Sequence, residues 1–256
     1  MIKHCALSAD EILCTALDVG EHLLRHGGEV YRVEDTINRI CSAYGAKHVE
    51  VFCITSVIIS AIRMPNGEYS SQIRRVYDSD NDLYKLEKLN EVSRKLCREC
   101  PSREDAMKLI NDAKIATPYP KYISCLGACI AVSAFAIFFG GTLRDALAGA
   151  VVEAIIMTIS NFIPKHLNKL ATTTIQSFAA GILSILSIYI GLGDNVDKVM
   201  IGTIMILIPG IAFGNSIRDI FNGDIISGSL KLFNSVVLAV AIAFGFSVSL
   251  LWFGGI

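Results

Sequence analysis

The sequence lacks the short motifs that carry nucleotide or hydrolytic chemistry. Its 256 residues contain no glycine-rich phosphate loop, no G-x-S-x-G and no H-E-x-x-H, so ATP-driven transport and hydrolysis have no motif here. Net charge is also nearly absent, since 23 Lys and Arg residues face 24 Asp and Glu residues. Nucleic-acid binding requires a basic surface that neutralises phosphates, so this balance argues against nucleic acid as a partner. We therefore expect neither an enzyme nor a bound cofactor.

Cysteine and histidine are present, but not in patterns that build disulfide frameworks or metal sites. Eight cysteines are scattered along the chain, and Cys97-x-x-Cys100 has no second pair, which predicts free thiols. His22 and His26 have the i,i+4 spacing that can chelate zinc, but no third ligand is near them in the sequence. We therefore expect no metal. The first residues contain no apolar run, so we also expect no cleavable signal peptide.

Charge is unevenly distributed along the chain. Residues 1–121 carry 35 charged side chains, whereas residues 122–256 carry only 12. This shift predicts a soluble domain over 1–121 and a membrane domain over 122–256. The boundary falls at Pro118–Tyr122, where two prolines disfavour a continuous helix and two tyrosines suit the lipid headgroup level.

The first domain has the pattern of an α+β fold. Apolar residues at helical spacing, β-branched runs and an Asn-Gly turn signal together give the order αα-βββ-αα. The expected elements are helices over 8–26 and 29–44, strands over 48–55, 57–62 and 69–77, and helices over 81–99 and 102–115. Ser102 is expected to cap the last of these helices.

The second domain is expected to be an all-α membrane bundle of five transmembrane helices. Each apolar stretch approaches the ~20 residues that cross a ~30 Å hydrocarbon core. The five stretches are 122–140, 145–163, 173–192, 197–221 and 229–253.

The placement of Lys and Arg predicts the orientation. If the first domain is cytoplasmic, the inside loops hold Lys165, Lys169, Arg218 and Lys231. The outside loops then hold only Arg144 and Lys198, in agreement with the positive-inside rule. We therefore expect a multi-pass protein of the inner cell membrane, with the N-terminal domain in the cytoplasm and the C-terminus outside.

Polar residues within the apolar stretches are candidates for a substrate or ion pathway. Glu153 falls in the middle of the second stretch, where an ionisable side chain costs ~2.5–3.5 kcal/mol on insertion scales. A structural carboxylate with a partner is the alternative.

Pro209 is expected to kink or break the fourth stretch, and broken spans expose backbone groups that transporters use to bind substrates and ions. A kink that serves only helix packing is the alternative there. The polar or flexible residues beside this break are Gly210, Asn215, Ser216, Arg218, Asp219 and Asp224.

Two stretches resemble motifs of the threonine/serine exporter family, in its split form with a YjjP-like subunit. The first is Leu24–Ile37, which contains Gly27-Gly28-Glu29 and Arg32-Val33-Glu34. The second runs from Pro209-Gly210 through Asn215, Arg218-Asp219 and Gly223-Asp224 to Ser227-Gly228. The sequence departs from the pattern at Gly214, where threonine is usual, and at Lys231, where arginine is usual.

The resemblance implies secondary export of small amino acids such as threonine and serine, or of dicarboxylates such as succinate, coupled to protons. It also implies a small YjjB-like membrane subunit as partner. Five spans end on the side opposite to their start, so a second five-helix unit would be inverted, as in many secondary transporters. A homo-oligomer is compatible with this plan.

Two alternatives remain open from the sequence. Glu29, Arg32 and Glu34 are candidates for a gate or docking face, or belong to a solvated helix with pairs such as Glu29–Arg32 and Asp35–Arg39. The second alternative concerns the whole chain, which would then be a membrane-anchored binding or regulatory module without a transport path. Five spans exceed what an anchor needs, which favours the transporter.

Overall fold

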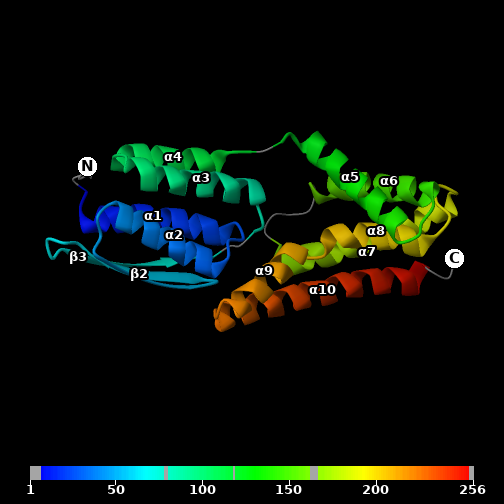
Figure 1. The fold of residues 1–256 in the computed structure, drawn as a ribbon. Coiled ribbons are helices and arrows are strands. Elements are labelled where there is room, and N and C mark those ends of the chain that lie inside the picture. Colours follow the sequence, from blue (N-terminus) through cyan, green and yellow to red (C-terminus); the bar gives the residue numbers. More distant parts are fainter. Residues whose placement is uncertain (1–6, 78–79, 118, 162–166, 254–256) are drawn as a thin grey trace. The chain divides into compact units, whose positions relative to one another are not determined.

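A computed structural model describes residues 7–77, 80–117, 119–161 and 167–253 (Figure 1). Expectations that concern residues 1–6, Pro118, Lys165 and residues 254–256 therefore lie outside the described residues. The chain divides into two compact units. The first comprises residues 1–118 and 211–233, and the second comprises residues 119–210 and 234–256.

The first unit contains the predicted α+β elements in the predicted order. Its helices and strands are α1 (Ala9–Arg25), α2 (Val30–Ala43), β1 (His48–Ile54), β2 (Val57–Arg63), β3 (Tyr69–Arg75), α3 (Leu83–Glu99) and α4 (Arg103–Ile115). Figure 1 shows three layers in this unit, with the sheet on one side of α1 and α2, and with α3 and α4 on the other. The order αα-βββ-αα is confirmed.

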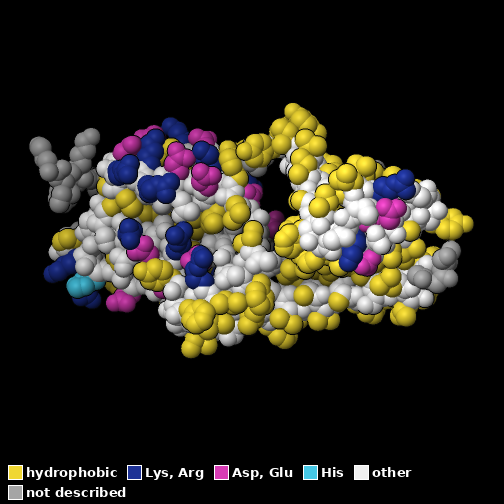
Figure 2. Space-filling model, turned by 45° about the vertical axis from the view of Figure 1, so that its right-hand side comes forward, with side chains coloured by type: hydrophobic (Ala, Val, Ile, Leu, Met, Phe, Trp, Pro, Cys, Tyr) yellow, Lys and Arg dark blue, Asp and Glu magenta, His cyan; other side chains and the backbone are white. Residues whose placement is uncertain are grey.

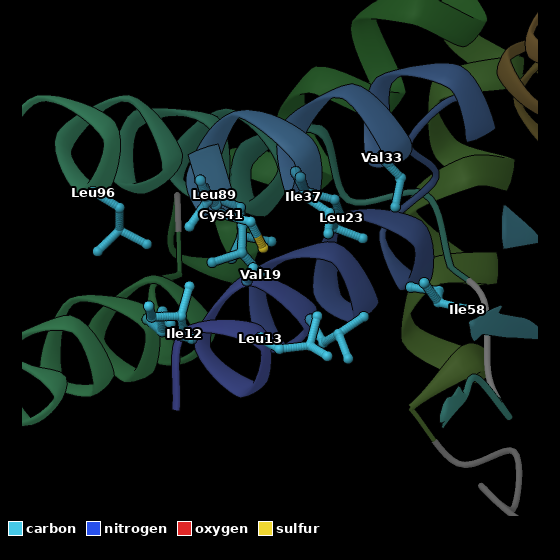
Figure 3. Packing of buried hydrophobic residues seen from close by; sticks show 14 of the residues in the cluster. Ile12, Leu13, Val19, Leu23, Val33, Ile37, Cys41, Ile58, Leu89 and Leu96 are labelled. Atoms are coloured by element: carbon cyan, nitrogen blue, oxygen red, sulfur yellow. The ribbon is translucent and has the colours of Figure 1, made fainter. Parts of the chain in front are cut away.

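The core of this unit is formed around α1 and α2, because both helices bury a wide apolar stripe (Figure 3). Leu13 and Val19 of α1 and Ile37 of α2 are completely buried. Gly20 lets the two helices approach closely, since a Cβ there would lie 2.6 Å from Cδ1 of Ile37. Further buried residues come from β2 and α3, including Ile58, Leu89 and Leu96.

The sheet is antiparallel in the order β1-β2-β3. Its side chains alternate, so that Cys53, Ile58 and Ile62 are buried under the helices whereas Phe52 and Ile59 on the other face are exposed. The expected Asn-Gly turn joins β2 to β3. Gly67 adopts a φ of +89° there, which explains the glycine.

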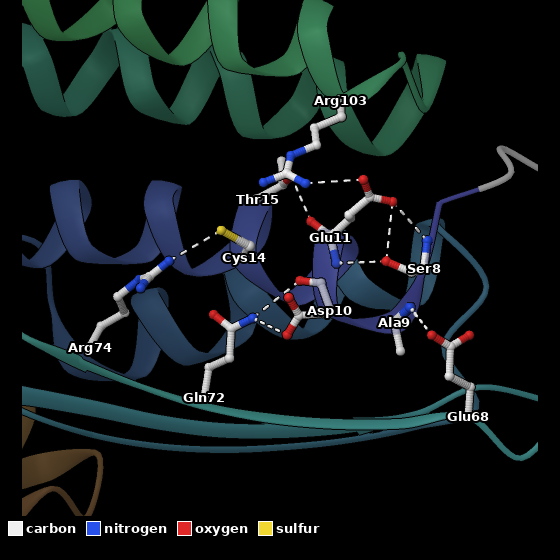
Figure 4. Close-up of polar contacts among 10 residues, drawn as sticks. All are labelled: Ser8, Ala9, Asp10, Glu11, Cys14, Thr15, Glu68, Gln72, Arg74 and Arg103. Carbon is white, nitrogen blue, oxygen red and sulfur yellow. Dashed lines mark hydrogen bonds and ion pairs between the residues drawn. The ribbon is translucent and has the colours of Figure 1, made fainter.

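The start of α1 is fixed to its neighbours by polar contacts (Figure 4). Ser8 and Glu11 form a capping box, in which the Glu11 carboxylate accepts from the Ser8 amide at 3.0 Å. The same carboxylate binds Arg103 of α4 at 3.0 Å. Gln72 of β3 donates to Asp10 at 2.7 Å, so α1 is attached to both outer layers.

Apolar helices follow in the rest of the chain. They are α5 (Lys121–Phe138), α6 (Leu143–Ser160), α7 (Lys169–Tyr189), α8 (Val196–Leu207), α9 (Gly210–Phe221) and α10 (Ile225–Phe253). Among the described residues, α5, α7 and α10 are long and apolar enough to cross a membrane, and α8 with α9 form a fourth candidate if the bent pair is one span. Figure 2 shows charged side chains over the first unit, and mostly hydrophobic ones with a small charged group over the second.

The second of the five expected spans coincides with α6, but this helix is not among those candidates. It carries Arg144, Asp145 and Glu153 within 18 residues, which is more charge than an ordinary span contains. Asp145 is completely buried and accepts hydrogen bonds from the amides of Thr142, Asp194 and Asn195 at 2.7–2.9 Å. Its charge therefore caps α6 and holds the loop between α7 and α8.

Candidate functional site

The turn between α1 and α2 leaves backbone groups available for other elements. Gly27, with a φ of +92°, and Gly28 end α1 in a Schellman motif, because the Gly28 amide donates to Leu23 at 2.8 Å. A side chain at Gly28 would place its Cβ 2.7 Å from the Leu23 carbonyl oxygen. The α1 helix uses the amides of this turn, so the Gly27 and Gly28 carbonyls and the Val30 amide are left for partners outside the two helices.

A second turn joins α9 to α10, the two helices that carry the polar residues facing these groups. Gly223 has a φ of +98°, and the Asp224 amide donates to the Asp219 carbonyl at 2.9 Å, again as in a Schellman motif. Gly228 lets the two helices pack closely, since a Cβ there would lie 2.7 Å from the Ser216 carbonyl oxygen. We call residues 211–233 the α9–α10 hairpin; all of it belongs to the first unit.

Asp219 and Lys231 of the hairpin bind the turn between α1 and α2. The Asp219 side chain is completely buried, accepts from the Val30 amide at 3.2 Å and accepts from Lys231 Nζ at 2.7 Å. Lys231 Nζ also donates to the Gly28 carbonyl at 3.2 Å. The carboxylate thus lies at the N-terminus of α2 and the ammonium at the C-terminus of α1, where each helix dipole favours that sign of charge.

Asn215 and Arg218 of α9 add two further contacts. Asn215 Nδ2 donates to the Gly27 carbonyl at 3.0 Å, and Arg218 forms an ion pair with Glu29. Arg32 lies 3.9 Å from the other oxygen of Glu29. The two stretches that carry the family resemblance, about 190 residues apart in sequence, therefore meet in one polar network.

Glu34 and Asp224 border this network. Glu34 Oε1 accepts from the Cys53 amide at 2.8 Å. Burial raises the pKa of Glu34, the Cys53 amide opposes this shift, and the negative charge of Asp224 adds to it. Burial and the charge of Asp219 likewise raise the pKa of Asp224, against the effect of Lys231. These carboxylates therefore hold protons more readily than ordinary surface acids.

The remaining predicted residues lie elsewhere. Ser216 is buried but bonds within its own helix, to the Phe213 carbonyl at 2.6 Å. Pro209 lies between α8, which ends at Leu207, and α9, which begins at Gly210, so the predicted break is confirmed.

Glu153 belongs to the second unit and is not part of the network. Its side chain, on α6, is 6% exposed. Within the described part of the chain, no hydrogen bond or ion pair reaches its carboxylate. Cys129 of α5 lies nearby and bonds to the Ala150 carbonyl at 3.3 Å. A buried carboxylate without a partner is energetically costly, which makes it a candidate for function rather than for stability.

The sequence pointed to only part of this network. In the sequence, Lys231 stands out only as a departure from the family pattern and as a positive charge beside a span. No sequence signal marks the Gly28 carbonyl or the Val30 amide. The ion pair Asp35–Arg39 exists at 2.7 Å, as the solvated-helix alternative expected. Glu29, the residue before α2, forms an ion pair with Arg218 of α9, so it is not part of a purely solvated helix.

The histidines of α1 offer a pH response instead of a metal site. Among the described residues, no group of three or more His, Cys, Asp or Glu side chains could hold a metal ion. Burial lowers the pKa of His22 to about 4, and the positive charges of Lys114 on α4 and Lys85 on α3 and the neighbouring His26 act in the same direction. In the unfolded chain His22 has the ordinary histidine pKa of about 6.5.

We expect acidification to destabilise the first unit through His22. Between pH 6.5 and about 4 the unfolded state binds a proton that the folded state resists, so stability falls as pH falls through this window. Thermal unfolding at a series of pH values will measure the slope of stability against pH. His22→Gln should flatten it, whereas His48→Gln, at an exposed position, should not. An unchanged slope in His22→Gln would contradict the assignment.

Comparison with known proteins agrees with this picture. A family model described as "Putative threonine/serine exporter" matches residues 15–252. A probable threonine/serine exporter of Mycobacterium tuberculosis is 21% identical over 250 residues, covering 95% of this chain and 46% of the relative. The threonine/serine exporter of Corynebacterium glutamicum is 20% identical, covering 91% and 50%. This chain therefore spans about half the length of these relatives.

A relative of similar length also exists. The probable succinate transporter subunit YjjP of Escherichia coli is 21% identical over 240 residues, covering 93% of both chains. No solved structure matches. Because the family model covers nearly the whole sequence, the chain belongs to the threonine/serine exporter family.

Proposed function

We propose that this chain is a membrane subunit of a secondary transporter that exports small amino acids, such as threonine and serine, or dicarboxylates such as succinate, in exchange for protons. Membership of the family supports transport. The single observation that carries the proposal is the network in which Asp219 and Lys231 of the α9–α10 hairpin bind the turn between α1 and α2. A simple membrane anchor would not need a buried charge pair between the α9–α10 hairpin and the turn between α1 and α2.

The proposed architecture has a cytoplasmic domain over residues 1–121 and five spans over residues 122–256, with the C-terminus outside. The apolar helices α5, α7 and α10 and the bent pair α8–α9 support four of these spans. We propose α6 as the fifth, because its mid-helix Glu153 is shielded within the second unit instead of facing outward.

Within this architecture the polar residues have two roles. The proposed substrate or ion pathway consists of Glu153, Pro209, Gly210, Asn215, Ser216, Arg218, Asp219 and Asp224. The proposed gate consists of Glu29, Arg32 and Glu34, of which Glu29 binds Arg218 directly. Through this contact, a movement of the broken segment would be transmitted to α2.

We further propose that a small YjjB-like membrane subunit completes the pathway. Two facts support a partner: the chain spans about half the length of the exporters of Mycobacterium tuberculosis and Corynebacterium glutamicum, and the relative of matching length is named a subunit.

Export from vesicles tests this function. The chain is placed in vesicles with and without a YjjB-like subunit, loaded with labelled threonine, serine or succinate, and given a proton gradient. We expect flux of at least one substrate only when both chains are present, and collapse of flux when a protonophore removes the gradient. Full export by this chain alone would refute the partner. Absence of flux with both chains would favour a membrane-anchored binding or regulatory module.

A further inference from the structure

A small pocket lies beside the network, and all residues that line it belong to the first unit. Its volume is about 210 Å³. This is below the ~300–1,000 Å³ of sites for drug-sized ligands, so only a small metabolite fits. Glu29, Arg32 and Arg218 supply its charges, and Leu83, Leu86 and Ile211 supply an apolar wall.

The charged groups of the pocket are only partly satisfied by one another. One oxygen of Glu29 is bound to Arg218. The other oxygen lies 3.9 Å from Arg32 Nε, which is too far for a hydrogen bond. The Glu29 side chain is only 12% exposed, whereas the Arg32 side chain is 70% exposed and therefore accessible to a ligand. A carboxylate oxygen and a guanidinium therefore line the same small space without being hydrogen-bonded together.

This pair of charges matches a zwitterion. The ammonium group of an α-amino acid can bind Glu29 while its carboxylate binds Arg32, and a short side chain then contacts the wall formed by Leu83, Leu86 and Ile211. A dicarboxylate matches less well, because its second carboxylate would meet the negative charge of Glu29 and find Arg218 already paired. Such a repulsive group is an effective means of rejecting a competing ligand.

We propose that this pocket is a binding site for a small zwitterionic α-amino acid, in which Arg32 holds the carboxylate and Glu29 selects against dicarboxylates. The site rests on the proposed function, since the ligand is the transported substrate or a close analogue of it. It adds to that function a recognition site formed by the turn between α1 and α2, by α3 and by α9 of the hairpin.

Calorimetric titration of the purified full-length chain with threonine and with succinate tests the site. We expect threonine to bind at least about tenfold more tightly than succinate. Glu29→Gln should weaken threonine binding about tenfold without weakening succinate, since it removes a charged hydrogen-bond partner of the ammonium group only. Arg32→Gln should weaken both ligands. The Arg32 side chain is 70% exposed, so this variant keeps the test valid even if Glu29→Gln loosens α2.

Arg39→Gln is the matched control. Arg39 lies on the same helix, is paired with Asp35 at 2.7 Å and does not line the pocket, so its replacement should change neither affinity. Absence of threonine binding, tighter binding of succinate, or an unchanged ratio in Glu29→Gln would each overturn the site. If vesicles show flux but Glu29→Gln leaves the ratio of threonine to succinate affinity unchanged, only the site is refuted. If threonine binds but no flux is seen, only the transport function is refuted.

Discussion

Lys231→Met is expected to destabilise the first unit by about 3–5 kcal/mol and to abolish transport. The Asp219 side chain is completely buried, and Lys231 Nζ is its cationic partner at 2.7 Å. Without the ammonium group, the carboxylate stays buried with the Val30 amide as its remaining bond among those described here. An uncompensated buried charge is costly, so we expect the α9–α10 hairpin to detach from the turn between α1 and α2.

Two measurements will follow this detachment. Thermal unfolding of the purified chain should show a lower midpoint than the wild type. Peptide-resolved thiol labelling should show faster modification of Cys53, which is 2% exposed and whose pKa burial raises to about 12. Cys53 lies near Asp219 and Lys231, so it reports on this contact in particular.

The double variant Asp219→Asn/Lys231→Met separates loss of the charge pair from loss of packing. Asparagine still accepts from the Val30 amide but leaves no buried charge, so most of the stability should return while transport stays lost. Lys198→Met is the matched control, because Lys198 pairs at 3.0 Å with Asp197, whose side chain is 60% exposed. If Lys231→Met and Lys198→Met have the same midpoint of thermal unfolding, the buried pair Asp219–Lys231 does not hold the hairpin in place.

The sequence was sufficient to predict the elements of the first unit, because their signals are local. Apolar spacing marks α1 and α2, Asn66-Gly67 marks the β-turn, and Ser102 caps α4 through its contact with the Asp105 amide at 3.3 Å. The break at Pro209 was also predictable, since proline lacks the amide hydrogen that a helix needs.

The network could not be predicted, because its contacts join residues that no local pattern relates. The bond from the Val30 amide to Asp219 spans 189 positions. Three of the groups involved are backbone atoms, namely the Gly27 and Gly28 carbonyls and the Val30 amide. Lys231 resembled a flanking charge because a positive residue beside a span is ordinarily explained by membrane orientation. No local pattern relates Asp145 to the loop between α7 and α8 either, although its carboxylate accepts hydrogen bonds from two amides of that loop at 2.7 Å.

Glu153→Gln is expected to reduce transport to the level of empty vesicles while leaving membrane insertion intact. Glutamine has nearly the same volume as glutamate, so packing inside the second unit should be preserved. Glu153 is 6% exposed, and no hydrogen bond or ion pair from the described residues reaches its carboxylate, so the folded state gains nothing from its charge. Removing that charge should leave the unfolding midpoint unchanged or raise it.

Loss of flux together with unchanged or higher stability would separate function from structure at this position. What glutamine lacks is the ability to bind and release a proton, and this is the step that proton-coupled transport requires of a shielded acid. Glu153→Asp, which keeps the acid, should retain partial flux, and Asp197→Asn, at an exposed carboxylate of α8, should retain full flux. Wild-type flux in Glu153→Gln would remove Glu153 from the pathway. A fall in its unfolding midpoint would instead identify the carboxylate as structural.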